Sequence, residues 1–187
     1  MAKIKNESNK LAKECMVTAL IELMKVRDFH SITITDLTQK AGVSRMAYYR
    51  NYTSKEDILN KFIGDVGADI HERLSAICTN SDLYNYYYAL LDQLGSYNDL
   101  AITAYRAGLG ELILAQISKQ MARTFPSLGT TTTERYRHFY MAGAFYNIFI
   151  EWLKNGQRET CGEIAQLCCS LTCEGCHLAL SKKPHTP

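Results

Sequence analysis

Residues 32–62 decide the fold, and they read ITITDLTQKAGVSRMAYYRNYTSKEDILNKF. Thr33 is suited to begin a helix because its hydroxyl can accept a main-chain N–H of the first turn. Gly42 can take the left-handed conformation that ends a helix, and Ser44 can cap the next one. The pattern therefore predicts a short helix over residues 34–40, a glycine turn, and a second short helix.

The second of these helices is expected to present a polar, basic face to solvent. Tyr48 and Tyr52 are four residues apart, so both lie on one side of the helix, which we expect to face inward. Arginine can bond guanine or phosphate, asparagine can bond adenine or phosphate, tyrosine can bond phosphate, and alanine and methionine can pack on thymine methyl groups. An outward face of this composition suits the major groove of DNA. The side chains assigned to it are Arg45, Met46, Ala47, Tyr49, Arg50 and Asn51.

The distribution of charge favours a nucleic-acid partner without establishing one. The 187 residues carry a net charge of +2. Residues 1–62 hold 11 Lys and Arg against 7 Asp and Glu, whereas residues 63–187 hold 10 against 12. The basic part is therefore the part expected to meet phosphate. The same helix-turn-helix shape also occurs as plain packing, so a domain with no nucleic-acid partner stays open at this point.

Three short motifs in this segment resemble the TetR family of transcriptional regulators. They are AGVS at residues 41–44, YYRNY at residues 48–52 and SKEDIL at residues 54–59. The family pattern has a tyrosine at the position of Tyr49 and a lysine at that of Lys55. The chain departs from it at Tyr48, where an aliphatic residue or phenylalanine is common, and at Tyr52, where phenylalanine is usual. The close match covers about residues 10–62.

The resemblance implies an all-α homodimer of about nine helices. Residues 1–54 would form a three-helix helix-turn-helix DNA-binding domain, and residues 55–187 a helical effector-binding and dimerisation domain. Binding of a small-molecule effector would move the DNA-contacting helices of the two subunits and change the affinity for a palindromic operator. The family's DNA-contacting positions fall on Thr33, Thr35, Ser44, Arg45, Met46, Ala47, Tyr49, Arg50, Asn51 and Lys55.

Apolar residues recur at spacings of three and four along nearly the whole chain, which predicts helices. Besides the two short helices, the expected spans are residues 6–27, 55–77, 83–94, 100–107, 111–124, 134–154 and 163–180. The longest apolar run, residues 139–150, contains Asn147 and is well below the roughly 20 residues of a membrane span. The N-terminus lacks the apolar core of a signal peptide. We therefore expect a cytoplasmic protein with no membrane segment.

The last two helices are expected to form a subunit interface. The helix over residues 134–154 is apolar on nearly all sides from Phe139 to Leu153, so it must be covered on more than one face. The final helix carries an apolar stripe of its own, and a two-fold contact of four helices would cover both. Filling of a monomer core is the alternative. The predicted interface residues are Gly143, Ile150, Leu167, Leu171 and Leu178.

Tyrosines are concentrated in the part of the chain that follows the helix-turn-helix. Tyrosine combines an apolar ring with a polar hydroxyl, which fits a pocket for a small, partly apolar ligand. The resemblance implies such an effector pocket, although each ring also suits ordinary core packing. The residues predicted to line the pocket are Tyr84, Tyr87, Tyr88, Tyr105, Tyr140 and Tyr146.

The chain has seven cysteines, five of them after residue 160. Cys173, Cys176 and His177 formally match the attachment motif for c-type haem, but the motif lies inside a helical pattern and no export signal precedes it, so we expect no cofactor. Cys169, Cys173 and Cys176 share one side of a helix and could bind a soft metal or be oxidised. They could equally be small apolar residues at an interface. We expect this structural role and no metal site, with thiol or metal sensing as the alternative.

The sequence contains none of several common catalytic motifs. HExxH, GxSxG and the phosphate-binding GxxxxGK[ST] are absent, and the glycines at 108 and 110 lack the third glycine and the preceding strand of a dinucleotide site. We therefore expect a ligand-responsive DNA-binding repressor, with no catalytic residues. The main alternative is a protein of the same fold that binds a protein partner as a co-regulator.

Overall fold

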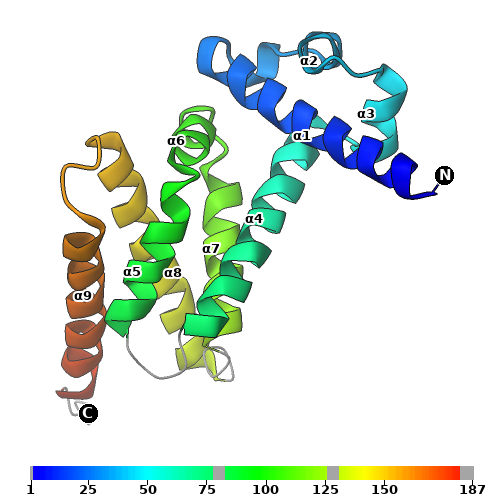
Figure 1. Ribbon diagram of the computed structural model, residues 1–187. Helices are drawn as coiled ribbons and strands as arrows, with labels where there is room; N and C mark the ends of the chain where they lie inside the picture. The colour runs from blue at the N-terminus through cyan, green and yellow to red at the C-terminus, as the bar shows by residue number, and fades with distance from the viewer. Residues whose placement is uncertain (1, 78–82, 126–130, 182–187) are drawn as a thin grey trace. The chain divides into compact units, whose positions relative to one another are not determined.

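The computed structural model describes the main chain of residues 2–77, 83–125 and 131–181, and the side chains of residues 7–74, 83–125 and 131–172. Within these ranges the chain is all-α, as predicted, with nine α-helices and one short 3-10 helix (Figure 1). The helices are α1 (Ala2–Val26), η1 (Phe29–Ser31), α2 (Ile34–Ala41), α3 (Arg45–Asn51), α4 (Lys55–Ile77), α5 (Leu83–Gly95), α6 (Asn98–Arg106), α7 (Gly110–Thr124), α8 (Thr132–Lys154) and α9 (Cys161–Ser181). None of the helices in the described ranges is both long enough and apolar enough to span a bilayer.

The chain divides into two compact units. The first comprises Met1–Val66 with Asp99–Gln116, and the second comprises Gly67–Asn98 with Ile117–Pro187. The predicted domain boundary after residue 54 falls within the first of these units. Ile58 and Leu59, in the first turn of α4, are both 0% exposed, and this burial holds the start of α4 in the first unit.

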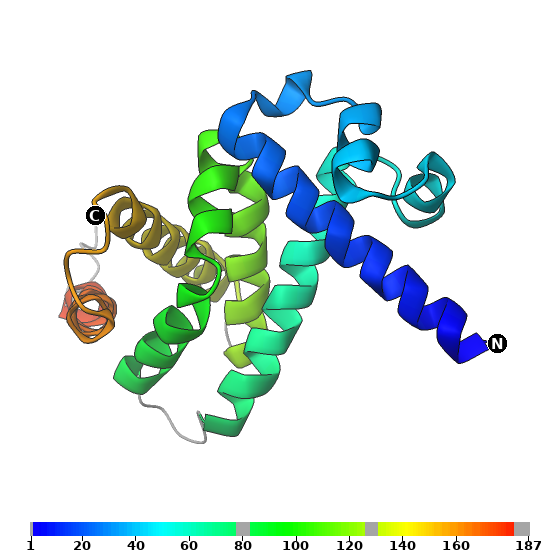
Figure 2. The same ribbon diagram turned by 45° about the horizontal axis from the view of Figure 1, so that its top comes forward.

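The core of the first unit forms where α1 packs against α2 and α3. Met16 and Leu20 of α1 are fully buried, and so are Leu37 of α2 and Tyr48 of α3. These side chains meet because α1 runs past both short helices (Figure 2). Burial of this apolar set stabilises the unit, since each fully buried side chain of this size contributes roughly 1.5–3 kcal/mol relative to an exposed one. The long helix α1 is thus the scaffold that fixes the two short helices.

The second unit contains α5, α8 and α9. Helix α5 packs along α9, and the two lie side by side in Figure 1. Aromatic rings form its interior: Tyr87 of α5 stacks on Phe145 of α8 with ring centroids 5.7 Å apart, and Phe145 stacks on Phe149 at 6.2 Å. Helix α8 begins with a reciprocal cap, in which the hydroxyl of Thr131 accepts the N–H of Glu134 and the carboxylate of Glu134 accepts the N–H of Thr131.

Candidate DNA-binding interface

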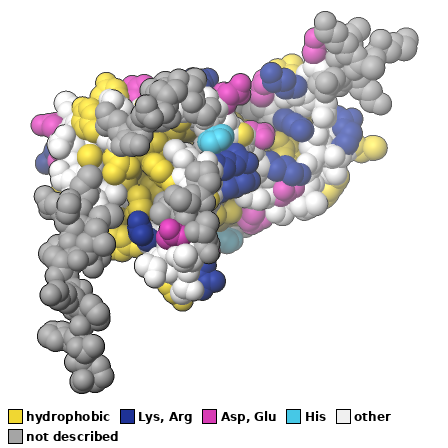
Figure 3. Space-filling model, turned by 90° about the horizontal axis from the view of Figure 1, so that it is seen from below, with side chains coloured by type: hydrophobic (Ala, Val, Ile, Leu, Met, Phe, Trp, Pro, Cys, Tyr) yellow, Lys and Arg dark blue, Asp and Glu magenta, His cyan; other side chains and the backbone are white. Residues whose placement is uncertain are grey.

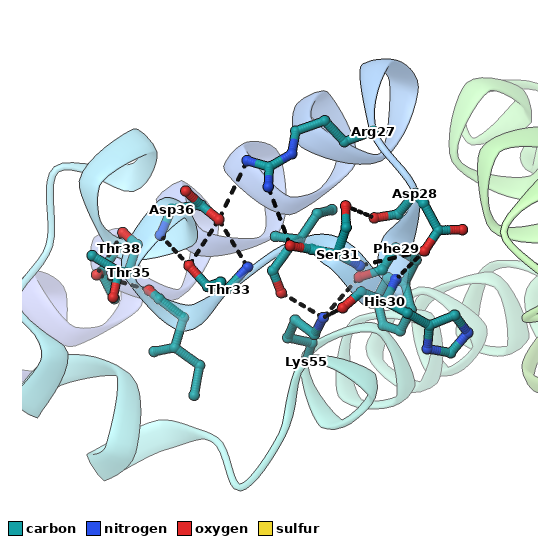
Figure 4. A network of polar contacts seen from close by, with 12 residues as sticks. Arg27, Asp28, Phe29, His30, Ser31, Thr33, Thr35, Asp36, Thr38 and Lys55 are labelled. Carbon is teal, nitrogen blue, oxygen red and sulfur yellow. Dashed lines mark hydrogen bonds and ion pairs between the residues drawn. The ribbon is translucent and has the colours of Figure 1, made fainter.

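Helix α2 begins with the cap that the sequence predicted at Thr33. The Thr33 hydroxyl accepts the N–H of Asp36 at 3.1 Å, and the Asp36 carboxylate accepts the N–H of Thr33 at 2.9 Å (Figure 4). The Arg27 guanidinium lies 3.3 Å from the same carboxylate. The bonds from the Thr33 main chain and hydroxyl lower the pKa of Asp36, and the pairing with Arg27 lowers it further. Thr33 therefore has a defined structural role, whether or not it also meets DNA.

The turn and the start of α3 also have the predicted local structure. Gly42 lies at φ 64° and ψ 29°, and its N–H donates to the carbonyl groups that end α2. The Ser44 hydroxyl accepts the N–H of Ala47 at 3.1 Å, which caps α3. Tyr48 and Tyr52 are buried at 0% and 5% exposure, so the inward face of α3 is the one expected.

The outward face of α3 carries four of the predicted DNA-contacting side chains. Arg45, Met46, Tyr49 and Arg50 are all exposed, Met46 at 82% and Tyr49 at 61%. Arg45 also donates a hydrogen bond to the hydroxyl of Thr35, which is half-buried on α2. Ala47 is half-buried beside them. The geometry thus brings two guanidinium groups and one phenol to the surface of a single helix of seven residues.

Asn51 does not lie free on this face. Its Nδ2 donates to the carbonyl of Ala47 at 2.8 Å and to Oδ1 of Asn9 at 2.9 Å, and its Oδ1 accepts from Nδ2 of Asn9 at 3.1 Å. Both amide protons are therefore used within the protein. To pair with adenine, which needs one N–H and one acceptor at the same time, Asn51 would have to release one of these bonds.

Asn9 is the residue that sequence reasoning missed at this site. Its Oδ1 also accepts from Nη2 of Arg50 at 2.9 Å, so one asparagine of α1 bonds two side chains at the end of α3. Asn9 is separated from these partners by 41 and 42 residues. A polar residue at one position of a long helix gives no signal of such a contact, because it depends on how α1 and α3 cross.

Lys55 is likewise engaged inside the protein. Its ammonium donates to the carbonyl oxygens of Phe29 at 2.7 Å and Ile32 at 2.5 Å, and it lies 4.7 Å from the centroid of the Phe29 ring (Figure 4). The ammonium therefore supports the end of η1. A phosphate contact by Lys55, as the family resemblance implied, would have to share this group with main-chain acceptors.

Basic side chains gather on part of the surface. Figure 3 shows Lys and Arg side chains grouped on the face that it presents, with Asp and Glu side chains among them. In the first unit, a groove of about 520 Å³ is bordered by the cationic groups of Lys10, Lys13 and Lys61. Lys61 is paired with Asp57 at 2.9 Å, so part of this positive charge is already neutralised. The local excess of positive charge is modest, as the sequence indicated.

The six tyrosines predicted to line an effector pocket lie in different surroundings in the structure. Tyr87 and Tyr140 border one cavity in the second unit, but its volume is only about 70 Å³, against roughly 300–1,000 Å³ for typical ligand pockets. The four others do not border this cavity. Tyr88 and Tyr105 are 44% and 37% exposed, and Tyr84 and Tyr146 are half-buried. Tyr105 belongs to the first unit. Tyr87 is instead a core residue, and its hydroxyl bonds that of Thr172 at 2.9 Å.

The predicted interface residues divide into two groups. Leu167 and Leu171 of α9 are 45% and 49% exposed, and Gly143 of α8 is half-buried, so all three can reach a partner. Ile150 is only 4% exposed, so its side chain is buried mainly within its own chain. Leu178 lies outside the residues whose side chains are described. Further apolar side chains are exposed on α8, namely Tyr136, Phe139 and Tyr140.

Of the four cysteines whose side chains are described, two have a raised pKa. Burial raises the pKa of the Cys168 thiol to about 11, and burial also raises that of Cys161. Among the side chains that the structure describes, no group of three or more His, Cys, Asp or Glu is placed to hold a metal ion. Cys173, Cys176 and His177, which carry the haem-like motif, lie outside those side chains.

Part of the chain matches a known protein family, and its fold resembles that of solved structures. Residues 16–62 match the family model of bacterial regulatory proteins of the tetR family. A search of curated proteins finds no match. Among solved structures, a TetR transcriptional regulator from Streptococcus agalactiae is 17% identical with a TM-score of 0.67, over 92% of this chain and 99% of that one.

Two further structures share the fold. The dihydroxyacetone kinase operon activator DhaS is 17% identical with a TM-score of 0.59, over 89% of this chain and 97% of its own. Thermus thermophilus FadR, a TetR-family repressor in complex with lauroyl-CoA, is 18% identical with a TM-score of 0.53, over 94% of this chain and 98% of its own. The likeness therefore covers almost the full length of each chain.

Proposed function

Because this chain belongs to the TetR family of bacterial regulatory proteins, we propose that it is a homodimeric transcriptional repressor that binds a palindromic operator and is released by a small-molecule effector. The observation that carries the DNA-binding part is the outward face of α3. Arg45, Tyr49 and Arg50 stand exposed on a helix whose first turn is capped and whose opposite face is buried. A rigid helix with exposed arginines is suited to bond base edges and phosphates in the major groove.

The homodimer is proposed from exposed apolar surface on the last two helices. Tyr136, Phe139 and Tyr140 of α8 are 64%, 59% and 67% exposed, and α9 adds the exposed Leu167 and Leu171. Apolar surface of this extent on neighbouring turns favours a protein contact. A second copy of the chain would cover it symmetrically and would present two α3 helices to the two halves of a palindrome.

The effector is proposed only by class. The T. thermophilus neighbour is a repressor in complex with lauroyl-CoA, and by likeness to it the effector of this chain is a partly apolar molecule. Lauroyl-CoA is therefore a reasonable first probe. The activator DhaS has the same fold, so the sign of regulation must be measured directly.

DNA binding is tested by selecting sequences from a pool of random duplexes and measuring affinity against salt concentration. We expect wild type to enrich a palindrome. Arg50→Ala and Arg45→Ala should each weaken binding, and a variant that loses one phosphate contact should lower the slope of log K against log salt by about 0.9. Lys119→Ala, an exposed lysine of α7, is the control and should leave both quantities unchanged.

A protein-binding co-regulator is the second candidate, and one observation favours it. Met46 and Tyr49 expose large apolar surfaces on the same face of α3 as the arginines, and such surfaces also occur in protein interfaces. If the selection enriches no duplex sequence and the salt dependence of Arg50→Ala equals that of wild type, this second candidate replaces the first.

A further inference from the structure

Asn9 connects the scaffold helix α1 to the last turn of α3 by three hydrogen bonds. Its Oδ1 accepts from Nη2 of Arg50 and from Nδ2 of Asn51, both at 2.9 Å, and its Nδ2 donates to Oδ1 of Asn51 at 3.1 Å. The two asparagines therefore form a reciprocal amide pair. Arg50 is attached to this pair through one of its terminal nitrogens.

The attachment leaves Arg50 able to contact DNA. A guanidinium group has five N–H donors in a planar fork, and only Nη2 has a partner within the described part of the chain. The side chain is exposed, so it would otherwise sample many rotamers. A hydrogen bond to Asn9 restricts that sampling before DNA arrives, and such preorganisation lowers the entropy lost on binding.

Asn51, unlike Arg50, has no amide proton left for DNA. Its two amide protons are donated to Asn9 and to the carbonyl of Ala47, which lies on the same helix. Reading adenine would require Asn51 to break one of these bonds. Its side chain is therefore suited to fix Asn9 in place, and Asn9 in turn fixes Arg50.

We infer that Asn9 is a positioning residue for base recognition: held by Asn51, it orients the Arg50 guanidinium toward the major groove. This inference rests on the proposed function, because it assigns a role within DNA binding. It also changes the expected recognition surface. Arg50 specifies a base, Asn51 contacts none, and a residue of α1 outside the helix-turn-helix determines how strictly that base is chosen.

The test compares two variants of Asn9 on the full-length protein, with DNA sequences selected from a random duplex pool. Asn9→Ala releases Arg50 and should relax the preference at the one base position, in each half-site, that Arg50→Ala also relaxes. The affinity for the selected operator should fall on the order of fivefold, which is the value of one hydrogen bond. The affinity for unrelated duplex DNA should stay that of wild type.

Asn9→Asp separates the effect of orienting Arg50 from the effect of charge at residue 9. It keeps the oxygen that accepts from Arg50, so the base preference should remain. Its added negative charge should weaken binding to every duplex alike. Ser8→Ala, the neighbouring exposed position on α1, is the matched control and should behave as wild type. Thermal unfolding of each variant reports whether it is folded.

The outcomes distinguish this inference from the function on which it rests. Relaxed preference in Asn9→Ala with retained preference in Asn9→Asp supports it. If Asn9→Ala keeps the base preference of wild type, or loses affinity equally for all sequences, the inference is overturned. The proposed function still stands in that case, provided that Arg50→Ala differs from wild type in base preference. If Asn9→Ala does not fold, loss of the preference in Asn9→Asp overturns the inference and its retention supports it. If wild type enriches no sequence, the proposed function fails, and the inference fails with it.

Discussion

The ammonium of Lys55 lies 4.7 Å from the centroid of the Phe29 ring and donates to the carbonyl oxygen of the same residue at 2.7 Å. One side chain from the first turn of α4 thus bonds both the main chain and the aromatic face of η1. Phe29 is 1% exposed, so the contact is anchored in the core of the first unit. The helix-turn-helix is therefore joined to α4 by a cation as well as by apolar packing.

Lys55→Ala should destabilise the protein. Its ammonium satisfies the carbonyl groups of Phe29 and Ile32, and hydrogen bonds from a charged donor contribute about 1.5–3 kcal/mol. We expect the free energy of unfolding, measured in urea, to fall by about that amount. Lys119→Ala is the control. The contrary result is that Lys55→Ala unfolds at the same urea concentration as wild type and shows only a smaller slope of log K against log salt in DNA binding. That result would mean that Lys55 contacts phosphate.

The cap at the start of α2 should make stability depend on pH. The pKa of Asp36 is lowered from its ordinary 3.8 by hydrogen bonds from Thr33 and by pairing with Arg27. A carboxyl group whose pKa is lower in the folded state stabilises the fold above its unfolded pKa, and this contribution is lost as pH falls through the folded pKa. The stability difference between wild type and Asp36→Asn should therefore be constant at neutral pH and shrink below pH 3.8.

Two variants of Thr33 check the cause of this dependence. Thr33→Ser keeps the hydroxyl and should retain the pH dependence of wild type, as followed by circular dichroism during urea unfolding. Thr33→Val removes the hydroxyl and should reduce it. Equal pH dependence in both variants would mean that the Thr33 hydroxyl does not perturb Asp36.

Gly42→Ala should destabilise the turn between α2 and α3. Gly42 lies at φ 64°, where an L side chain costs about 1–2 kcal/mol, although no atom would contact the added Cβ within 4 Å. Thermal unfolding measures the loss. Gly95→Ala is the matched control, because that glycine also has open space around it and its φ is not in the left-handed region. A melting temperature equal to that of wild type would show that the turn tolerates a side chain.

Leu171→Glu should weaken the proposed homodimer. Leu171 is 49% exposed on α9, so the substitution removes apolar contact area and introduces a charge with little effect on the single chain. Sedimentation equilibrium should give a larger dissociation constant than for wild type. Leu11→Glu, at a leucine of α1 that is 61% exposed, should leave the dimer unchanged. Equal dissociation constants for all three proteins would place the interface elsewhere.

Cys168 should react slowly with alkylating agents. Burial raises its pKa from 9.0 to about 11, so the thiolate fraction at a given pH below 9 falls about a hundredfold. Mass spectrometry after iodoacetamide treatment should find Cys168 modified in urea but scarcely in buffer. Modification at equal rates in both conditions would reopen a redox role for this cysteine.

The short-range features of residues 33–52 could be predicted from the sequence alone. The caps at Thr33 and Ser44, the left-handed Gly42, and the inward pair Tyr48 and Tyr52 each depend on residues within a few positions of one another. Local hydrogen bonding and helical periodicity determine such features. The same regularity predicted the nine α-helices seen in the described ranges, with ends that differ by up to four residues, the largest difference being at the start of α1.

Only the tertiary structure decided which side chains are buried or hydrogen-bonded to distant parts of the chain. Asn9 meets Asn51 across 42 residues, Lys55 meets Phe29 across 26, and Ile150 is buried in its own chain. These outcomes depend on the crossing angle and rotation of packed helices, which the periodicity of one helix does not encode. Periodicity shows that a polar group lies outside the apolar stripe, but a neighbouring helix determines whether it faces solvent or a hydrogen-bond partner. For this reason the sequence predicts which helix has the face suited to contact DNA, and the packing determines which side chains on that face have no bonds within the protein.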